Sequence, residues 1–138
     1  MEQIEMEKYS QKAIDSNVLV GVFLPDDRLE HKALEIFRKL GKGGFGIYVH
    51  PLVLIETLSI LKYKGGVKLA IESKKTILSN FLTDNNMGLV SESSEKYFEK
   101  YANIGMVDAI LLDYCLKNKM ELITLDKTLN EVWKRLSK

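Results

Sequence analysis

Cysteine is almost absent from this chain, and several such absences limit what the protein can be. The single cysteine, Cys115, excludes an internal disulfide framework and a cysteine-rich zinc site. No apolar run reaches the roughly 18 residues that a membrane-spanning helix needs. Residues 1–11 are acidic and lack the basic end and apolar stretch of a signal peptide. We therefore expect a cytoplasmic protein that does not associate with membranes.

Neither sign of charge dominates, because 20 basic and 19 acidic side chains leave a net charge of +1, which identifies no partner. The distribution of the lysines is more informative. Five of them cluster around the single acid Glu72, namely Lys62, Lys64, Lys68, Lys74 and Lys75. Such a cluster is usually a solvated helical face, but it also suits contacts with the phosphates of a nucleic acid. Lys62, Lys64 and Lys68 are therefore candidate nucleic-acid contacts.

The chain contains no internal repeat, low-complexity tract or recognisable linker between domains. Its 138 residues match the usual size of one domain and allow a substantial core. We expect residues 1–11 to form a short N-terminal extension and residues 12–138 to form a single domain.

Short β-type runs alternate with longer segments of helical spacing. The predicted strands cover residues 12–15, 46–50, 88–91 and 121–126, and an apolar run at 18–22 continues the first of them. The predicted helices cover about 27–41, 51–64, 67–82, 97–102 and 106–119, with a last helix after residue 127. Asp27 with Glu30, and Thr128 with Glu131, have the spacing of capping boxes. This alternation predicts an α/β fold in which helices cover both faces of a mainly parallel sheet.

Two aspartates directly follow predicted strands. Asp15 ends the run Lys12-Ala-Ile-Asp, and Asp126 ends the run Glu121-Leu-Ile-Thr-Leu-Asp. In open parallel sheets, ligands bind beyond the carboxyl ends of the strands, where the strand order reverses. An aspartate at such a place can equally cap the next helix or begin a turn. The position alone leaves both interpretations open.

Two further acids fall on the apolar sides of predicted helices. At 100° per residue, Glu56 lies among apolar neighbours of its helix, and Asp108 lies close to Leu111 and Cys115. Asp113 is the contrast, because it falls on the polar side of the same helix, four residues before Lys117. We therefore expect Asp113 to be an ordinary surface acid, whereas Glu56 and Asp108 need an explanation.

Burying an ionised carboxylate without a partner costs several kcal/mol. A buried basic partner is one answer, but Arg28, Arg38 and Arg135 all lie in exposed sequence contexts. Raised pKa values that keep the acids neutral are a second answer. A divalent cation shared by the acids is a third, and it accounts for all four at once. A set of oxygen ligands suits Mg²⁺ or Mn²⁺.

Cations held by carboxylates favour chemistry on phosphoryl groups, because they orient a water molecule and stabilise the developing charge. No protein nucleophile is then required. His31 falls on the exposed side of its helix and His50 precedes a proline, so neither has the partners of a catalytic triad. The acids thus predict a metal-dependent phosphodiesterase.

Four segments, in this order and at this spacing, resemble the motifs of PIN domains, and specifically of the VapC-type toxins of toxin–antitoxin pairs. The resemblance extends over about residues 12–136. The segments are Ile14-Asp-Ser-Asn-Val-Leu19, Pro51-Leu-Val-Leu-Ile-Glu56, Val107-Asp-Ala-Ile-Leu111 and Leu122-Ile-Thr-Leu-Asp-Lys127. The resemblance implies a three-layer α/β/α sandwich around a mainly parallel twisted sheet. It also implies an endoribonuclease that requires Mg²⁺ or Mn²⁺.

The resemblance also implies roles for single residues. Asp15, Glu56 and Asp108 would be the core metal ligands, and Asp126 a fourth acid that acts directly or through water. Asn17 and Thr124 would support the ligands through hydrogen bonds. PIN domains commonly form homodimers, and VapC-type toxins cut RNA and bind an antitoxin protein that blocks the site. The eleven residues before the first strand depart from the usual start of small toxins, so an RNA-processing nuclease that is not a toxin stays open.

A catalytically inactive PIN-like module that binds RNA or protein is a further alternative, although all four acids are present. Three other features carry no functional prediction. The segment 41–46 satisfies G-x-G-x-x-G but follows a predicted helix instead of a strand, so we expect a connection and not a dinucleotide site. Cys115 is expected in the core, and Trp133 in the core or at a dimer contact.

Overall fold

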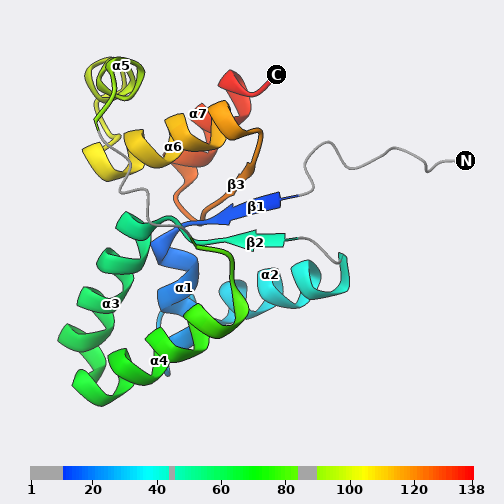
Figure 1. Cartoon of the computed structure of the whole chain (residues 1–138), viewed down its shortest axis with the longest axis vertical. Helices are drawn as coiled ribbons and strands as arrows, with labels where there is room; N and C mark the ends of the chain where they lie inside the picture. Colours follow the sequence, from blue (N-terminus) through cyan, green and yellow to red (C-terminus); the bar gives the residue numbers. More distant parts are fainter. Residues whose placement is uncertain (1–10, 44–45, 84–89) are drawn as a thin grey trace, which may run out of the picture.

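A parallel sheet of three strands runs through the middle of the computed structural model, which describes residues 11–43, 46–83 and 90–138. The strands are β1 (Gln11–Ile14), β2 (Gly46–Tyr48) and β3 (Glu121–Ile123), in the order β2-β1-β3. Ala13 pairs with Tyr48 on one side and with Leu122 on the other, so β1 is the central strand. The strand order therefore reverses at β1, and the carboxyl ends of all three strands share one edge (Figure 1).

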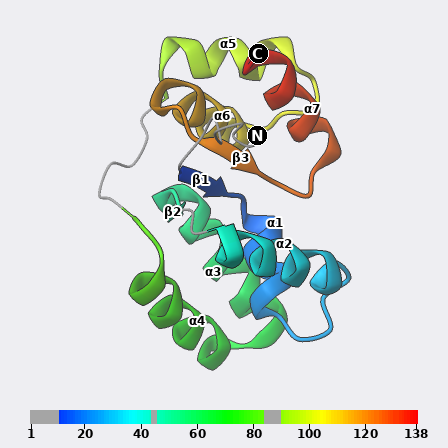
Figure 2. The same ribbon diagram turned by 90° about the vertical axis from the view of Figure 1, so that its right-hand side faces the viewer.

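Seven helices in the described residues cover the two faces of the sheet. On one face lie α1 (Ser16–Phe23), α2 (Glu30–Gly43), α3 (Pro51–Gly65) and α4 (Val67–Asn80). On the other face lie α5 (Glu92–Lys100), α6 (Met106–Asn118) and α7 (Lys127–Leu136). Figures 1 and 2 show this separation from two directions. The predicted three-layer α/β/α arrangement is confirmed. None of these helices is long and apolar enough to cross a membrane.

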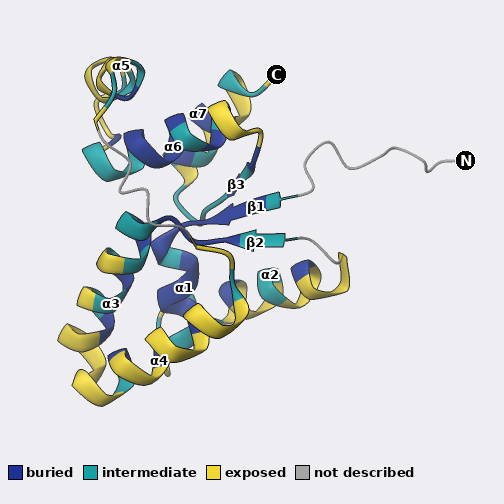
Figure 3. Ribbon diagram, in the orientation of Figure 1, coloured by how far each residue is buried: buried dark blue, intermediate teal, exposed yellow. Residues whose placement is uncertain are grey.

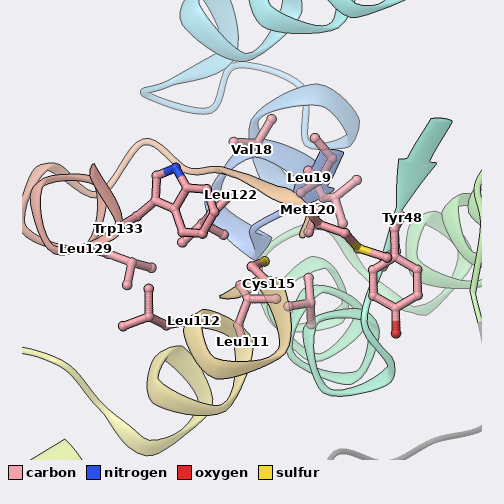
Figure 4. Packing of buried hydrophobic residues seen from close by; sticks show 14 of the residues in the cluster. Val18, Leu19, Tyr48, Leu111, Leu112, Cys115, Met120, Leu122, Leu129 and Trp133 are labelled. Atoms are coloured by element: carbon pink, nitrogen blue, oxygen red, sulfur yellow. The ribbon is translucent and has the colours of Figure 1, made fainter. Parts of the chain in front are cut away.

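The core lies between the sheet and its helices, and the central strand β1 is buried from Lys12 to Ile14 (Figure 3). Figure 4 shows Cys115 of α6 inside this cluster, with Trp133 and Leu129 of α7 close by. The prediction that Cys115 belongs to the core is confirmed, and of the two places predicted for Trp133, the structure shows the core. A second, smaller cluster joins α1 to α3 and α4, and its buried members are Val20, Leu24, Leu61 and Ala70.

The apolar run at residues 18–22 belongs to helix α1 and does not continue the first strand. Asp15 begins this helix, since its side chain accepts a hydrogen bond from the Ser16 backbone N–H. Gly21 allows α2 to pack closely, because a Cβ there would lie 2.6 Å from the Cβ of Ala33. The chain therefore turns from β1 directly into a buried helix, and Asp15 stands at the turn.

The structure corrects both predicted capping boxes. Asp27 accepts a hydrogen bond from the Leu29 backbone N–H before α2 begins at Glu30, and α2 continues past Gly41 to Gly43. The last helix is capped by Asp126, whose carboxylate accepts from the Leu129 N–H at 3.1 Å, and not by a Thr128–Glu131 pair. Asp27 thus binds an N–H two residues on instead of three, whereas Asp126 binds at the usual spacing of three residues but caps the last helix two residues before the predicted Thr128.

The strand predicted at 88–91 is not found where the structure can test it. Val90 and Ser91 lie outside any strand, and Ser91 caps α5. Residues 88–89 are outside the described ranges, as are residues 1–10 of the predicted extension and 44–45 of the 41–46 segment. The chain returns to the sheet earlier, at Leu82, which forms an isolated parallel bridge with Tyr48.

The other predicted boundaries hold within a few residues, except that the helix predicted at 97–102 is α5, which begins five residues earlier, at Glu92. The helix expected to end near Lys64 ends at Gly65, and Gly66 follows with a φ of 98° that favours glycine. The strands predicted at 46–50 and 121–126 are shorter than expected, because β2 ends at Tyr48 and β3 at Ile123. Beyond β2, the Val49 backbone N–H still donates to the Leu82 carbonyl at 2.8 Å.

Candidate functional site

Asp15 and Asp126 lie beyond the carboxyl ends of neighbouring strands, β1 and β3. The register pairs Ile14 with Ile123, so Asp15 stands level with Thr124. The Asp15 backbone N–H donates to the Ile123 carbonyl at 2.9 Å, which extends the strand pairing to the site. Both aspartates also cap the helix that follows, which is the structural role that the sequence left open. Capping uses only part of the acceptor capacity of a carboxylate, so the carboxylate oxygens of both aspartates can still accept from or bind another group.

Thr124 and Asn17 tie the two strand ends together through hydrogen bonds. The Thr124 hydroxyl donates to Asp15 Oδ2 at 2.6 Å and accepts from the Asp126 backbone N–H at 3.0 Å. The Asn17 side chain donates to Thr124 Oγ1 at 3.2 Å and accepts from the Leu125 N–H at 3.0 Å. Asp15 is 3% exposed and is held in place by this network.

Glu56 and Asp108 reach the same region from two helices on opposite faces of the sheet. Glu56 is on α3, which begins after His50, whose Nδ1 accepts from the Leu52 N–H, with Pro51 in its first turn. Asp108 is in the first turn of α6, where the helix dipole favours a negative charge. Both carboxyl groups are half-buried. Asp15, Glu56, Asp108 and Asp126 are called the acidic cluster below.

The electrostatics show that the acidic cluster is one interacting group. Burial, and then the charges of Asp15, Glu56 and Asp126, raise the pKa of Asp108 from 3.8 to about 7. Burial also raises the pKa of Asp15, against hydrogen bonds from Thr124 and Ser16, and Glu56 and Asp126 raise it further. The charged groups acting on both carboxyls are all acids. Four acids from distant parts of the sequence therefore converge and repel each other.

Replacing Asp108 with asparagine should stabilise the metal-free protein at neutral pH. The raised pKa means that the folded state binds the Asp108 proton more tightly than the unfolded state, so stability falls as pH rises from about 4 to about 7. The shift corresponds to at most about 4 kcal/mol, which solvent screening at this half-buried group reduces to roughly 1–2 kcal/mol. Melting in chelator at pH 7.5 should show the gain, and the difference should vanish near pH 4. A less stable variant at pH 7.5 would contradict this electrostatic account.

The donor chemistry of the acidic cluster fits a hard divalent cation. Its carboxylates are all oxygen donors, which Mg²⁺ and Mn²⁺ prefer, and their repulsion is what a cation would relieve. Among the described residues, no three His, Cys, Asp or Glu side chains stand close enough together to hold a metal ion as they are. The acids therefore converge electrostatically, and their side chains would have to draw closer to share an ion.

Two charged pairs outside the cluster differ from the sequence prediction, one in its existence and one in its burial. Lys12 is 5% exposed and donates to Glu121, so the described core does contain a paired lysine, but it pairs across β1 and β3 and not with the acidic cluster. Asp113 pairs with Lys117 at 3.0 Å as predicted. It is only 7% exposed, however, and accepts hydrogen bonds from Ser91 and Ser93. The prediction of an ordinary surface acid was wrong.

The remaining candidates lie largely where their sequence contexts placed them. Lys62, Lys64 and Lys68 are all exposed around the junction of α3 and α4. Arg28, Arg38, Arg135 and His31 are exposed, whereas His50 is buried. Burial raises the pKa of the Cys115 thiol, and nearby Asp15 adds to the rise, so this cysteine is a poor nucleophile.

A family model for the PIN domain matches residues 12–134. This match spans most of the sequence, and the chain therefore belongs to the PIN domain family. No curated protein sequence matches the chain significantly. The resemblance inferred from the four acidic motifs is confirmed at the level of the family.

Among solved structures, the fold is similar to that of the VapC20 toxin of Mycobacterium tuberculosis, which is described as a toxin that cleaves the sarcin–ricin loop. The TM-score is 0.66, with 15% sequence identity, and the match covers 87% of this chain and 93% of the toxin. At this identity the likeness establishes a common fold. The two chains therefore share this fold over most of their lengths.

Proposed function

We propose that this protein is a metal-dependent endoribonuclease whose active site is the acidic cluster. The observation that carries the proposal is the convergence of four acids at the carboxyl edge of the sheet, where burial and then the other three acids raise the pKa of Asp108 to about 7 with no basic group among its charged partners. PIN domains are typically nucleases, and the structurally similar VapC20 is a toxin that cleaves RNA. Both facts support hydrolysis of RNA phosphodiester bonds.

In this proposal Asp15, Glu56 and Asp108 hold Mg²⁺ or Mn²⁺, and Asp126 completes the set directly or through water. When bound, the cation orients the attacking water and offsets negative charge on the phosphoryl group. Asp15 is positioned by the hydroxyl of Thr124, and that hydroxyl is in turn fixed by Asn17. Preorganised ligands of this kind lose little freedom on binding. Thr124 and Asn17 are positioning residues.

The partners follow the family. We propose that Lys62, Lys64 and Lys68 contact the RNA backbone, because all three are exposed. Lys62 and Lys64 lie in the last turn of α3, which also carries Glu56, and Lys68 lies in the first turn of α4. We also propose a homodimer and a VapBC-type antitoxin partner, as the resemblance to VapC-type toxins implies. A small reading frame for an antitoxin beside the gene would favour the toxin assignment over an RNA-processing nuclease.

The decisive experiment incubates the purified protein with end-labelled single-stranded and structured RNA pools, with Mn²⁺, with Mg²⁺ or with EDTA. We expect fragments only with metal, and none from an Asp126→Asn variant prepared in parallel, which controls for contaminating nucleases. RNA that binds but stays intact with either metal would instead identify an inactive binding module. The inactive binding module is the second candidate because, in the part of the chain that the structure describes, no three His, Cys, Asp or Glu side chains lie close enough together to hold a metal ion.

A further inference from the structure

A pocket of about 430 Å³ opens next to Asp15, between α1, the turn that follows α1 and the second half of α3. Ser16 and Asn17 line one wall. Ser16 donates its backbone N–H to Asp15, and Asn17 is the side chain that fixes Thr124. The pocket and the acidic cluster therefore share a wall, although none of the four acids lines the pocket.

Helix α3 also connects the two places. Glu56, Ile60 and Lys64 follow one another at intervals of four residues, so they lie along one side of the helix. Ile60 and Lys64 line the pocket. At a rise of 1.5 Å per residue, Lys64 lies about 12 Å along the axis from Glu56. A single strand that reaches the acidic cluster is thus within reach of the pocket.

The floor of the pocket is apolar and rigidly supported. Val20 and Leu24 are buried members of the second core cluster, and Ile60 packs against that cluster. Their positions are fixed by contacts with Leu61 and Ala70 behind them. Because these side chains are already packed, a flat apolar ligand group could bind against them without a large loss of side-chain entropy.

Charged groups of both signs line the rest of the pocket. Arg28 and Lys64 are exposed cations, and Asp26 and Asp27 are lining acids. The Asp27 carboxylate already accepts the Leu29 backbone N–H at 3.0 Å. Because two acids balance two cations, a bare anion gains little here. A ligand that combines an apolar ring, hydrogen-bonding groups and one phosphate matches the lining better, and the volume suits a small-molecule site.

We propose that this pocket receives one unstacked nucleotide of the RNA, close to the bond that the acidic cluster cleaves. The base rests on Val20, Leu24 and Ile60, and Arg28 and Lys64 contact its phosphate. Proteins commonly read single-stranded RNA through bases that are splayed out in this way. The inference rests on the proposed ribonuclease function and adds that the pocket selects the nucleotide near the cleavage site.

Two variants test the pocket by different means. Ile60→Trp fills the floor without changing charge. The double variant Arg28→Gln with Lys64→Gln removes both cations at exposed positions, where substitutions usually have little effect on stability. The matched control is Arg38→Gln with Lys96→Gln, which removes two exposed cations that do not line the pocket. Binding of a fluorescent single-stranded RNA is measured by anisotropy in EDTA, so that no cleavage intervenes.

We expect Ile60→Trp to weaken RNA binding about 10-fold or more, which is the effect of losing one stacked or packed base. The double variant should lower the dependence of log Kd on log salt by about one unit for each lost phosphate contact, and the control should lower it less. With Mn²⁺, the rate of RNA cleavage relative to that of bis(p-nitrophenyl) phosphate should fall about 10-fold in both pocket variants. The small diester reports on the acidic cluster alone.

The outcomes separate this inference from the proposed function. If the wild-type protein cleaves RNA, but the pocket variants bind and cleave RNA as the control does, the pocket assignment is wrong and the ribonuclease stands. An equal loss on RNA and on the small diester would also overturn the pocket, because it would place the effect at the acids. If the wild-type protein cleaves neither substrate, while the pocket variants still lose RNA binding, the ribonuclease is wrong and a nucleotide pocket remains.

Discussion

Asp15→Asn is expected to lower metal-dependent RNA cleavage by about 10³-fold, since a cation held by carboxylates contributes several kcal/mol to transition-state stabilisation. The substitution removes the charge but keeps the shape and one oxygen acceptor. Asp15 is buried, and both of its oxygens accept hydrogen bonds, Oδ1 from the Ser16 N–H and Oδ2 from the Thr124 hydroxyl. The amide keeps only one acceptor oxygen, so we also expect a loss of stability of about 1–3 kcal/mol. Initial rates with Mn²⁺, measured together with thermal melting in EDTA, separate lost chemistry from lost structure.

Asp113→Asn is the matched control for this prediction. Asp113 is also a buried aspartate that accepts hydrogen bonds from hydroxyl groups, here those of Ser91 and Ser93. It lies outside the groups that act on Asp15 and Asp108. We expect it to lose stability, because it gives up its charged bond to Lys117, and to keep its cleavage rate within about twofold once folded. Similar activity losses in both variants would contradict the assignment of Asp15.

Leu112→Ala is expected to have the largest effect on stability, about 3 kcal/mol, within the usual range for truncating a buried leucine. Leu112 is completely buried in the main core cluster, on the same helix as Asp108. The truncation removes transfer free energy and leaves a cavity between α6 and its neighbours (Figure 4). Urea unfolding at equilibrium measures the loss.

Leu34→Ala is the control for the core prediction, because Leu34 is 47% exposed on α2. We expect its effect on unfolding free energy to stay within about 0.5 kcal/mol. If Leu112→Ala were equally mild, the packing of α6 against the sheet would be wrong, and so would the placement of Asp108 that depends on it.

The fold and the convergence of the acids were accessible from sequence because they depend on local rules. Asp15 and Asp126 directly follow apolar runs, and parallel strands bring their carboxyl ends to one edge. The helical positions of Glu56 and Asp108 on apolar sides added the other two acids. Each inference needed only spacing along the chain and the rule that buried charge requires compensation.

Helix α1 was missed for a physical reason. It is only eight residues long and contains three valines, which favour strands in isolation. Tertiary packing against α2 and α3 makes it helical. The burial of Asp113 was inaccessible for a different reason, since its hydroxyl donors lie 20 and 22 residues away on another helix and its cap. No spacing rule within one element reports such a contact.

The most direct test of the central claim is the melting temperature of the wild-type protein as Mn²⁺ is added after complete chelation. A cation that binds only the folded acidic cluster stabilises it by about 2.7 kcal/mol at 100 times its Kd, which raises the melting temperature by several degrees. Asp15→Asn should abolish most of this rise. A wild-type melting temperature that stays constant up to millimolar Mn²⁺ would contradict the account, because the four acids would then converge without holding an ion.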